Sequence, residues 1–297
     1  MRIQLGCELE IDCEQPTPML ALVHPHASRR GDLVEPEILN ILPDRTTEVL
    51  VDRSGNRWCR FLASAGRTRF RYATLLRDGG LPDPRLPEVG ECPVGALPVD
   101  SYRYLNPSRY CDTDRLSELA WRTFAHTRPG WSRVQAICDW VHATIAFDHD
   151  AASSGKNASD TLREGAGVCR DFAHLAITLC RCLNLPARYC TGYLGDTGVP
   201  AMKDPIDFSA WFEVFLADRW YVFDARYNVP RIGRVLIARG RDAADVPFLR
   251  SFGPHQLAGF RVITAAEALP AEGERGRITP PLPLPPPAPG GSAYGRA

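Results

Sequence analysis

The chain has 297 residues, of which 35 are Lys or Arg and 35 are Asp or Glu, so its formal net charge at pH 7 is zero. This balance offers no basic excess for binding nucleic acid and no polybasic patch for a membrane surface. The hydrophobic fraction of 44% is ordinary for a globular protein, and no apolar run approaches the roughly 20 residues of a membrane helix.

The first 80 residues have the pattern of β-strands. Apolar residues alternate with mostly polar ones from Ile3 to Ile11, which is typical of a half-buried strand and not of a signal peptide. We therefore expect a cytoplasmic protein. The alternating runs "EVLVDRSGNRWCRFLAS" and "TRFRYATLL" follow, and a Gly–Asn turn signal divides the first. Residues 1–80 are thus predicted to form a small all-β sandwich domain.

The remaining chain has three parts. Residues 81–100 are rich in Pro and Gly, which predicts a linker. Helical periodicity then begins, and the strand patterns "ARYCTGYL", "DFSAWFEVFL" and "RWYVFD" come after it. Helices followed by an antiparallel sheet predict an α+β core over residues 101–263. Residues 264–297 include the run "ITPPLPLPPPAPGGSAYGRA" and are expected to form a disordered, Pro-rich tail.

The ten cysteines do not suggest a disulfide framework, because the sequence carries no export signal. The closely spaced pair Cys180 and Cys182 lies within an apolar helical pattern. No second pair with metal-ligand spacing follows it, so we expect no metal site. Most of the cysteines are therefore predicted to be small buried hydrophobic residues.

Cys169 is set apart by its surroundings. Gly165 and Gly167 interrupt the chain before it, and the apolar residues after it recur at helical spacing: Phe172, Leu175, Ala176, Leu179 and Leu183. Cys169 is therefore predicted in the first turn of a helix, where unpaired N–H groups and the helix dipole favour a thiolate. The same N–H groups can stabilise an oxyanion, as an acyl-transfer nucleophile requires. The alternative is a buried thiol at a helix start.

The segments "GVCRDFAHLAITLCRCLNLPARYCTGY" and "SAWFEVFLADRWYVFDARYN" resemble the transglutaminase-like superfamily, in its bacterial branch of transglutaminase-like cysteine proteases. The resemblance covers most of residues 101–263, and the strand-rich start resembles the β domain that precedes this core in bacterial members. It implies a papain-like core, a Cys-His-Asp triad, a peptide or protein substrate, and no cofactor. Cys169 matches the nucleophile and Asp224 the acid, whereas the position of the base holds Ser209.

Ser209 changes what the resemblance implies, because a hydroxyl cannot replace imidazole as a general base near neutral pH. Loss of one triad member commonly lowers the rate by several orders of magnitude. Asp224 is then expected to form a hydrogen bond with Ser209 across the hairpin. His149, on a loop before the Cys169 helix, is an alternative base. His174 lies five residues after Cys169 and points about 140° away on the helix, so we interpret it as structural.

Other polar and aromatic residues near these motifs have open interpretations. Trp211 shares a strand face with Ser209 and Glu213, so it either walls a substrate groove or belongs to the core. Glu213 is interpreted as a surface carboxylate, and Asp171 as a residue that supports the start of the helix. The four arginines within residues 231–246 are interpreted as a solvated or salt-bridged stretch, and binding of a substrate carboxylate is the alternative.

Three functional hypotheses follow. The first is a cysteine-dependent amide hydrolase or acyl transferase that uses Cys169 with Asp224. The second is a catalytically impaired module of the same fold that binds a peptide or protein. The third is a redox-responsive thiol protein. None of them involves nucleic acid, a membrane or a metal, and the choice between hydrolysis and transamidation stays open, as do the substrate and the oligomeric state.

Overall fold

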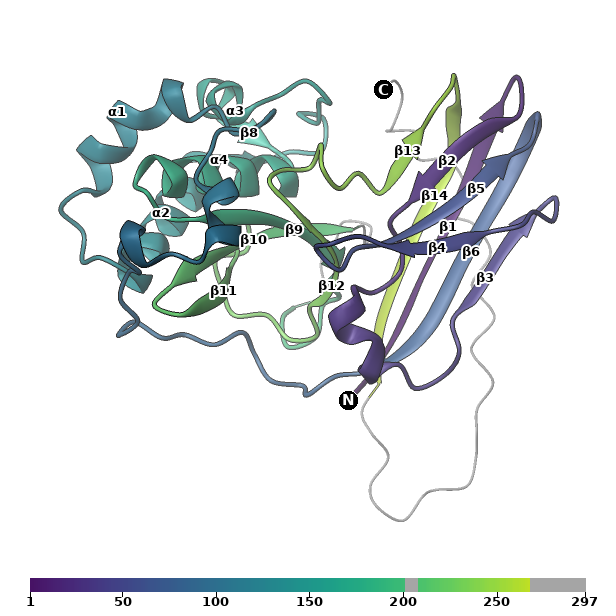
Figure 1. The fold of residues 1–297 in the computed structure, drawn as a ribbon, viewed down its shortest axis with the longest axis horizontal. Coiled ribbons are helices and arrows are strands. Elements are labelled where there is room, and N and C mark those ends of the chain that lie inside the picture. The colour runs from purple at the N-terminus through teal and green to yellow at the C-terminus, as the bar shows by residue number, and fades with distance from the viewer. Residues whose placement is uncertain (201–207, 268–297) are drawn as a thin grey trace, which may run out of the picture.

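The structure is a computed structural model, and it describes residues 1–200 and 208–267 (Figure 1). Three four-stranded antiparallel sheets and a short parallel strand pair make up its β structure. Its α-helices are α1 (Thr113–Phe124), α2 (Trp131–Thr144), α3 (Ala158–Glu164) and α4 (Cys169–Cys182). Short 3-10 helices span Ala27–Asp32, Val94–Ala96 and Val99–Tyr104. Within these ranges no helix is long and apolar enough to span a membrane.

Two of the sheets pack face to face as a β-sandwich, which confirms the architecture expected for the strand-rich start of the chain. One sheet has the order β14-β1-β6-β3 and the other the order β13-β2-β5-β4. Phe61 and Phe70, one from each sheet, have ring centroids 5.3 Å apart in the interior. The strands are β1 (Arg2–Cys13), β2 (Thr17–Ala21), β3 (Ile38–Leu42), β4 (Glu48–Val51), β5 (Arg57–Ala63), β6 (Gly66–Arg77), β13 (Leu249–Ser251) and β14 (Gln256–Glu267).

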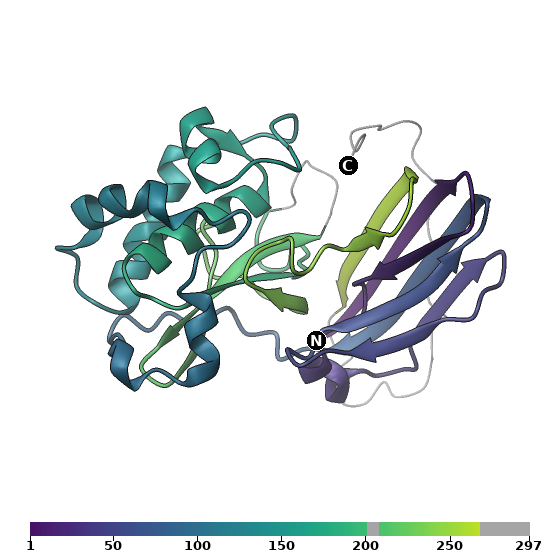
Figure 2. The ribbon, with the colours of Figure 1, turned by 45° about the horizontal axis from the view of Figure 1, so that its top comes forward.

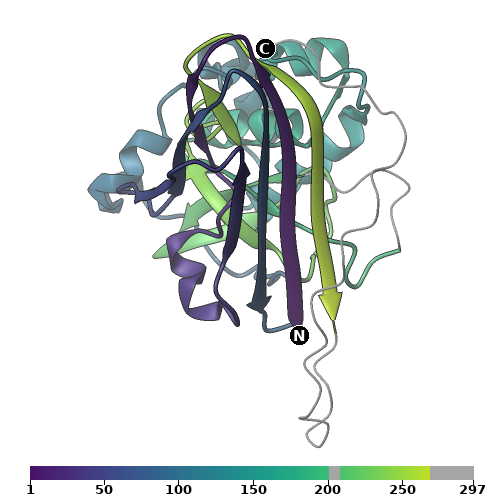
Figure 3. The same ribbon diagram turned by 90° about the vertical axis from the view of Figure 1, so that its right-hand side faces the viewer.

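The two last strands of the described chain lie in this sandwich and not beside the helices. β14 pairs with β1 along nearly its whole length, and Figure 3 shows these two long strands side by side. The core boundary expected at residue 263 therefore falls inside β14, because alternation of apolar residues predicts a strand but does not identify its partner. From residue 268 onward, the expected Pro-rich tail lies outside the described residues.

The third sheet and the helices form the predicted α+β core. The sheet has the order β11-β10-β9-β12, and the helices cover one of its faces (Figure 2). His174 of α4 contacts Tyr189 at 5.1 Å, and Trp131 of α2 contacts Phe223 at 4.5 Å between ring centroids. The strands are β9 (Ala187–Tyr193), β10 (Ser209–Leu216), β11 (Arg219–Phe223) and β12 (Val235–Gly240).

The expected linker, residues 81–100, lies against the core. The amide of Asp83 donates to the carbonyl of Arg231 at 2.9 Å, and the amide of Trp131 donates to the carbonyl of Val89 at 2.8 Å. Gly130 has a φ of +96°, and a Cβ on it would stand only 2.2 Å from the Val89 carbonyl oxygen. A side chain at this position would therefore separate the linker from the start of α2.

Candidate active site

Cys169 is the first residue of α4, as the sequence predicts. The chain reaches it from α3 through Gly165, whose φ of +67° ends that helix, and through the short strand β8 (Ala166–Gly167). Val168 is the extended residue before the helix, and its amide donates to Asp171 Oδ2 at 3.0 Å. This hydrogen bond fixes the backbone on both sides of Cys169 and confirms that Asp171 supports the helix start.

Asp171 is an acid without solvent contact. Its side chain is 0% exposed, and Oδ1 lies 3.3 Å from Arg170 Nε. Burial raises the pKa of the Asp171 carboxyl above its ordinary value, although Arg170 opposes the shift. Arg170 also donates from Nη2 to the carbonyl of Ser153 at 2.6 Å. The residues that flank the thiol are thus held by a network within the first turn of the helix.

Solvent access distinguishes Cys169 from most of the other thiols. Eight of the ten cysteines are buried, as predicted, and Cys92 and Cys169 are partly exposed. Burial raises the pKa of Cys7, Cys59 and Cys182 to about 12. Among the described residues, no group of three or more His, Cys, Asp and Glu side chains could hold a metal ion.

The thiol lies beside the backbone at the start of β10. Cys169 Sγ is 3.9 Å from the carbonyl oxygen of Phe208, the residue directly before Ser209. Ser209 is 4% exposed, and its carbonyl accepts a hydrogen bond of 3.2 Å from Thr191 Oγ1. The fold therefore brings the predicted nucleophile to the strand end that carries the serine.

Asp224 follows directly after β11, and its hydrogen bonds differ from the expected ones. Oδ1 accepts from the amides of Arg226 at 3.0 Å and Tyr227 at 3.1 Å, and Oδ2 accepts from Arg234 Nη2 at 3.1 Å. The expected hydrogen bond from Ser209 is wrong for this structure. Because Phe212 pairs with Phe223, continuation of the register sets Ser209 opposite position 226, two residues beyond Asp224.

Arg234 joins the core to the linker. Its side chain is 6% exposed, and Nη2 lies 3.1 Å from a carboxylate oxygen of both Asp83 and Asp224. Its guanidinium carbon lies 4.7 Å from the ring centroid of Trp211. The two acids thus share one buried cation, and neither of them is an uncompensated buried charge.

Trp211 and Glu213 lie on β10 within the protein. Trp211 is 2% exposed and packs with Cys190 and Leu236, so its ring forms part of a small apolar cluster. The expectation that Glu213 is a surface carboxylate is wrong, because its side chain is only 7% exposed. Arg188 and Arg239, from the neighbouring strands β9 and β12, lie 2.6 Å and 3.0 Å from its Oε2.

The arginines of residues 231–246 contact acids and carbonyls of the protein, which agrees with the expectation of a solvated or salt-bridged stretch. Arg234 and Arg239 form the ion pairs described above. Arg241 Nε lies 3.0 Å from Asp245, and Arg231 donates from Nη2 to the carbonyl of Gly195 at 2.7 Å.

His174 is a structural residue, as predicted. It is 0% exposed and stacks on Tyr110 with ring centroids 5.0 Å apart. Its Nε2 accepts a hydrogen bond of 3.1 Å from the amide of Ala243. Burial lowers the pKa of His174 well below its ordinary value, which favours the neutral ring. Its place on α4, five residues after Cys169, turns it away from the thiol.

Arg226 links the Asp224 loop to the Cys169 region, a connection that the sequence did not reveal. Its guanidinium carbon lies 3.6 Å from the ring centroid of Phe147. Phe147 belongs to β7 (Ala146–Phe147), which pairs in parallel with β8, and its partner is Gly167. The loop after Asp224 and the short strand before Cys169 are therefore linked through Phe147.

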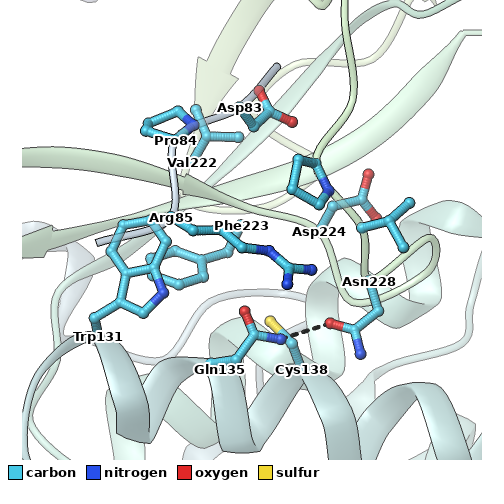
Figure 4. A pocket seen from close by; sticks show the side chains of 12 residues that line it. Asp83, Pro84, Arg85, Trp131, Gln135, Cys138, Val222, Phe223, Asp224 and Asn228 are labelled. Carbon is cyan, nitrogen blue, oxygen red and sulfur yellow. Dashed lines mark hydrogen bonds between the residues drawn. The ribbon is translucent and has the colours of Figure 1, made fainter. Parts of the chain in front are cut away.

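A small open cleft lies beside Asp224 (Figure 4). The linker, α2 and the loop after β11 surround it, and Gln135 Nε2 donates to Asn228 Oδ1 at 2.7 Å across one side. No sequence motif joins these three segments, so the cleft was not predicted. Its lining residues are Asp83, Pro84, Arg85, Trp131, Gln135, Cys138, Val222, Phe223, Asp224, Asn228, Val229 and Pro230.

Comparison with known proteins identifies a family for the part of the chain that holds these residues. The family model described as the transglutaminase-like superfamily matches residues 118–225, which include Cys169, Ser209 and Asp224. A solved structure from Cytophaga hutchinsonii, described as a candidate cysteine protease, is similar with a TM-score of 0.78 and 33% identity. The similarity covers 91% of this chain and 93% of that one.

Curated relatives are mycobacterial proteins of uncharacterised function. One from Mycobacterium tuberculosis is 28% identical over 190 residues, which are 61% of this chain and 60% of the relative. One from Mycobacterium leprae is 25% identical over 149 residues, which are 49% of this chain and 53% of the relative. The match thus spans less than two thirds of the length of these relatives.

Proposed function

This chain belongs to the transglutaminase-like superfamily, and on that premise we propose that it is a cysteine-dependent enzyme that hydrolyses or transfers amide acyl groups of a peptide or protein. The observation that carries the proposal is the position of Cys169. It is a partly exposed thiol in the first turn of a buried helix, whereas eight other cysteines are buried. The dipole and unpaired N–H groups of this turn favour a thiolate.

The chemistry of this proposal proceeds through a thioester. Once a base has taken the thiol proton, Cys169 Sγ attacks the amide carbon, and helix-start N–H groups stabilise the negative charge on the carbonyl oxygen. The C–N bond then breaks, and the proton returns to the leaving amine. Attack by water on the thioester gives a carboxylic acid, whereas attack by a primary amine gives a new amide.

In this proposal, Asp224 has a positioning role. Its carboxylate holds the amides of Arg226 and Tyr227 and thereby shapes the loop that reaches Phe147. The cleft beside Asp224 is the proposed approach for part of the substrate, because it has an apolar wall at Trp131 and polar groups at Arg85 and Asn228. Ser209 occupies the position of the family's base and does not act as one.

A second candidate function is peptide or protein binding without turnover. Two observations favour it: the expected base is Ser209, and Asp224 contacts Arg234 in place of an imidazole. A module of this kind would keep the cleft and the half-buried thiol but form no thioester. It therefore predicts saturable binding that survives the Cys169→Ala substitution.

The test of the proposed enzyme begins with the thiol. In a Cys92→Ser background, the rate of Cys169 alkylation by iodoacetamide is measured against pH, with mass spectrometry to locate the label and the unfolded chain as reference. We expect an apparent pKa well below the roughly 8.5 of an ordinary thiol. A Cys169 that reacts no faster than in the unfolded chain at neutral pH contradicts the proposal.

Turnover is then measured with a peptide library and with casein plus a fluorescent primary amine, which separate hydrolysis from transamidation. Cys169→Ala is expected to abolish either product, whereas Cys92→Ala serves as the matched control and retains it. Product formation by purified Cys169→Ala protein rules out the proposed enzyme. Binding of a library peptide without product, unchanged in Cys169→Ala, favours the binding module.

A further inference from the structure

The proposed thioester chemistry requires a base that Ser209 does not supply. Among the histidines of the described chain, three lie in the sandwich part: His24 contacts Glu37 at 2.9 Å, His26 contacts the carbonyl of Ser54 at 2.7 Å, and His255 directly precedes β14. His174 is buried and neutral within α4. His142 of α2 contacts the carbonyl of Arg226 at 2.8 Å, and His126 lies just after α1. We therefore seek the base in the segments that adjoin the start of α4.

The parallel pairing of β7 and β8 brings together the segments that lead to His149 and Cys169. Ala146 pairs with Ala166, and Phe147 pairs with Gly167. The hydrogen bonds extend past this pair, because the amide of Asp148 donates to the carbonyl of Gly167 at 3.1 Å. His149 lies two residues after Phe147, and Cys169 lies two residues after Gly167. Each residue therefore lies two positions beyond the end of a paired strand, His149 in the bend after β7 and Cys169 as the first residue of α4.

Ring contacts indicate that the His149 side chain lies on the side of β7 that faces α4. The ring of His149 meets Phe147 edge-on, with centroids 4.8 Å apart. Phe147 in turn lies 6.5 Å from Phe172 between ring centroids. Phe172 is three residues after Cys169, so both project from the same face of α4. The imidazole, the two phenyl rings and the first turn of α4 thus form one continuous layer.

Local hydrogen bonds hold the backbone around His149. Asp148 Oδ1 accepts from the amide of Asp150 at 2.9 Å, and the carbonyl of His149 accepts from the amide of Ala152 at 3.2 Å. From the Asp224 loop, Arg226 covers the ring of Phe147. His149 is exposed, so its imidazole can exchange protons with solvent and with a leaving amine.

We propose that His149 is the catalytic base of this site, in place of the strand histidine whose position holds Ser209. This inference rests on the proposed function. One imidazole nitrogen of His149 takes the proton from Cys169 Sγ, which leaves a thiolate beside an imidazolium. After the thiolate has formed its bond to the amide carbon, the imidazolium gives the same proton to the leaving nitrogen as the C–N bond breaks. His149 then activates the water or amine that cleaves the thioester.

The test is the pH profile of Cys169 alkylation in His149→Gln, with His126→Gln as the control. His126 is an exposed histidine just after α1. In the Cys92→Ser background, His149→Gln is expected to lower the alkylation rate near pH 7 by about tenfold or more and to move the midpoint toward the ordinary thiol pKa of about 8.5. At about pH 10, where every accessible thiol is ionised, its rate should equal that of the parent.

The outcomes separate this inference from the proposed function. If Cys169 of the parent has no lowered pKa, the proposed function fails and the inference fails with it. If the parent shows the lowered pKa and His149→Gln shares it, the inference alone is overturned. If the alkylation rate of His149→Gln is lower by the same factor at all pH values, the substitution has disturbed packing, and the inference is overturned. The same holds if the His126→Gln control loses as much alkylation rate as His149→Gln. A lower alkylation rate near neutral pH in His149→Gln alone supports the inference that His149 is the base.

Discussion

Gly167 and Asp171 lie so close together that a side chain on the glycine would overlap the aspartate. A Cβ on Gly167 would stand 2.8 Å from Asp171 Cβ and 2.9 Å from its Oδ2. Because the same Oδ2 accepts the Val168 amide, this close approach and the helix-start hydrogen bond depend on each other. Gly167, two residues before Cys169, is therefore required for the close packing of the turn that leads to the thiol.

Gly167→Ala is expected to displace Asp171 and disturb the start of α4. Overpacking of this kind costs about 1–3 kcal/mol in the free energy of unfolding, which urea titration measures. The alkylation rate of Cys169 should change as well. Gly155→Ala is the matched control, because a Cβ at Gly155 meets no atom within 4 Å. Equal free energies of unfolding for Gly167→Ala and Gly155→Ala would show that the turn accommodates the added methyl group without loss of stability.

Native-state alkylation should modify two cysteines of the chain. Cys92 and Cys169 are partly exposed, whereas the other eight are buried, and burial raises the pKa of Cys182, for example, to about 12. Brief treatment with iodoacetamide near pH 8, followed by mass spectrometry, is expected to label only these two, because reaction requires access and a thiolate. The unfolded chain should take up label at all ten positions. Rapid labelling of Cys180 or Cys138 in the folded protein would contradict this account of the core.

Arg234→Met should destabilise the protein strongly, because it leaves Asp83 and Asp224 without their shared cation. Loss of one partner from a buried ion pair costs about 3–5 kcal/mol in the free energy of unfolding. Arg115→Met provides the control, since Arg115 is 64% exposed and 4.0 Å from Asp112. That pair should contribute less than about 1 kcal/mol. Similar urea midpoints for both variants would show that Asp83 and Asp224 find other partners.

His174 should contribute to loss of stability in mild acid. Burial holds its pKa well below the ordinary value, so below about pH 6.5 the unfolded chain binds a proton that the folded protein excludes. The free energy of unfolding should therefore decrease as the pH falls, with a slope from this group that approaches about 1.4 kcal/mol per pH unit. His174→Gln should show a shallower slope between about pH 7 and pH 5 in urea titrations. An unchanged slope would exclude His174 as a source of the acid sensitivity.

Features that depend on near neighbours in the chain were predictable from the sequence. The alternation from Ile3 to Ile11 predicted β1, and the helical spacing after Cys169 predicted α4, since both periods follow from backbone geometry. The glycines before Cys169 and the acid at position 171 indicated where the helix begins. The placement of the thiol in a first helical turn, with its N–H groups and dipole, was therefore predictable without any long-range contact.

Tertiary structure decided which distant segments became partners. β14 completes the sheet beside β1, Arg234 takes the place expected for Ser209 beside Asp224, and two arginines from neighbouring strands bury Glu213. Each of these depends on the register and packing of segments far apart in the chain, which local periodicity does not encode. The proposed role of His149 depends on the same kind of contact, because β7 and β8, which precede His149 and Cys169, pair in parallel.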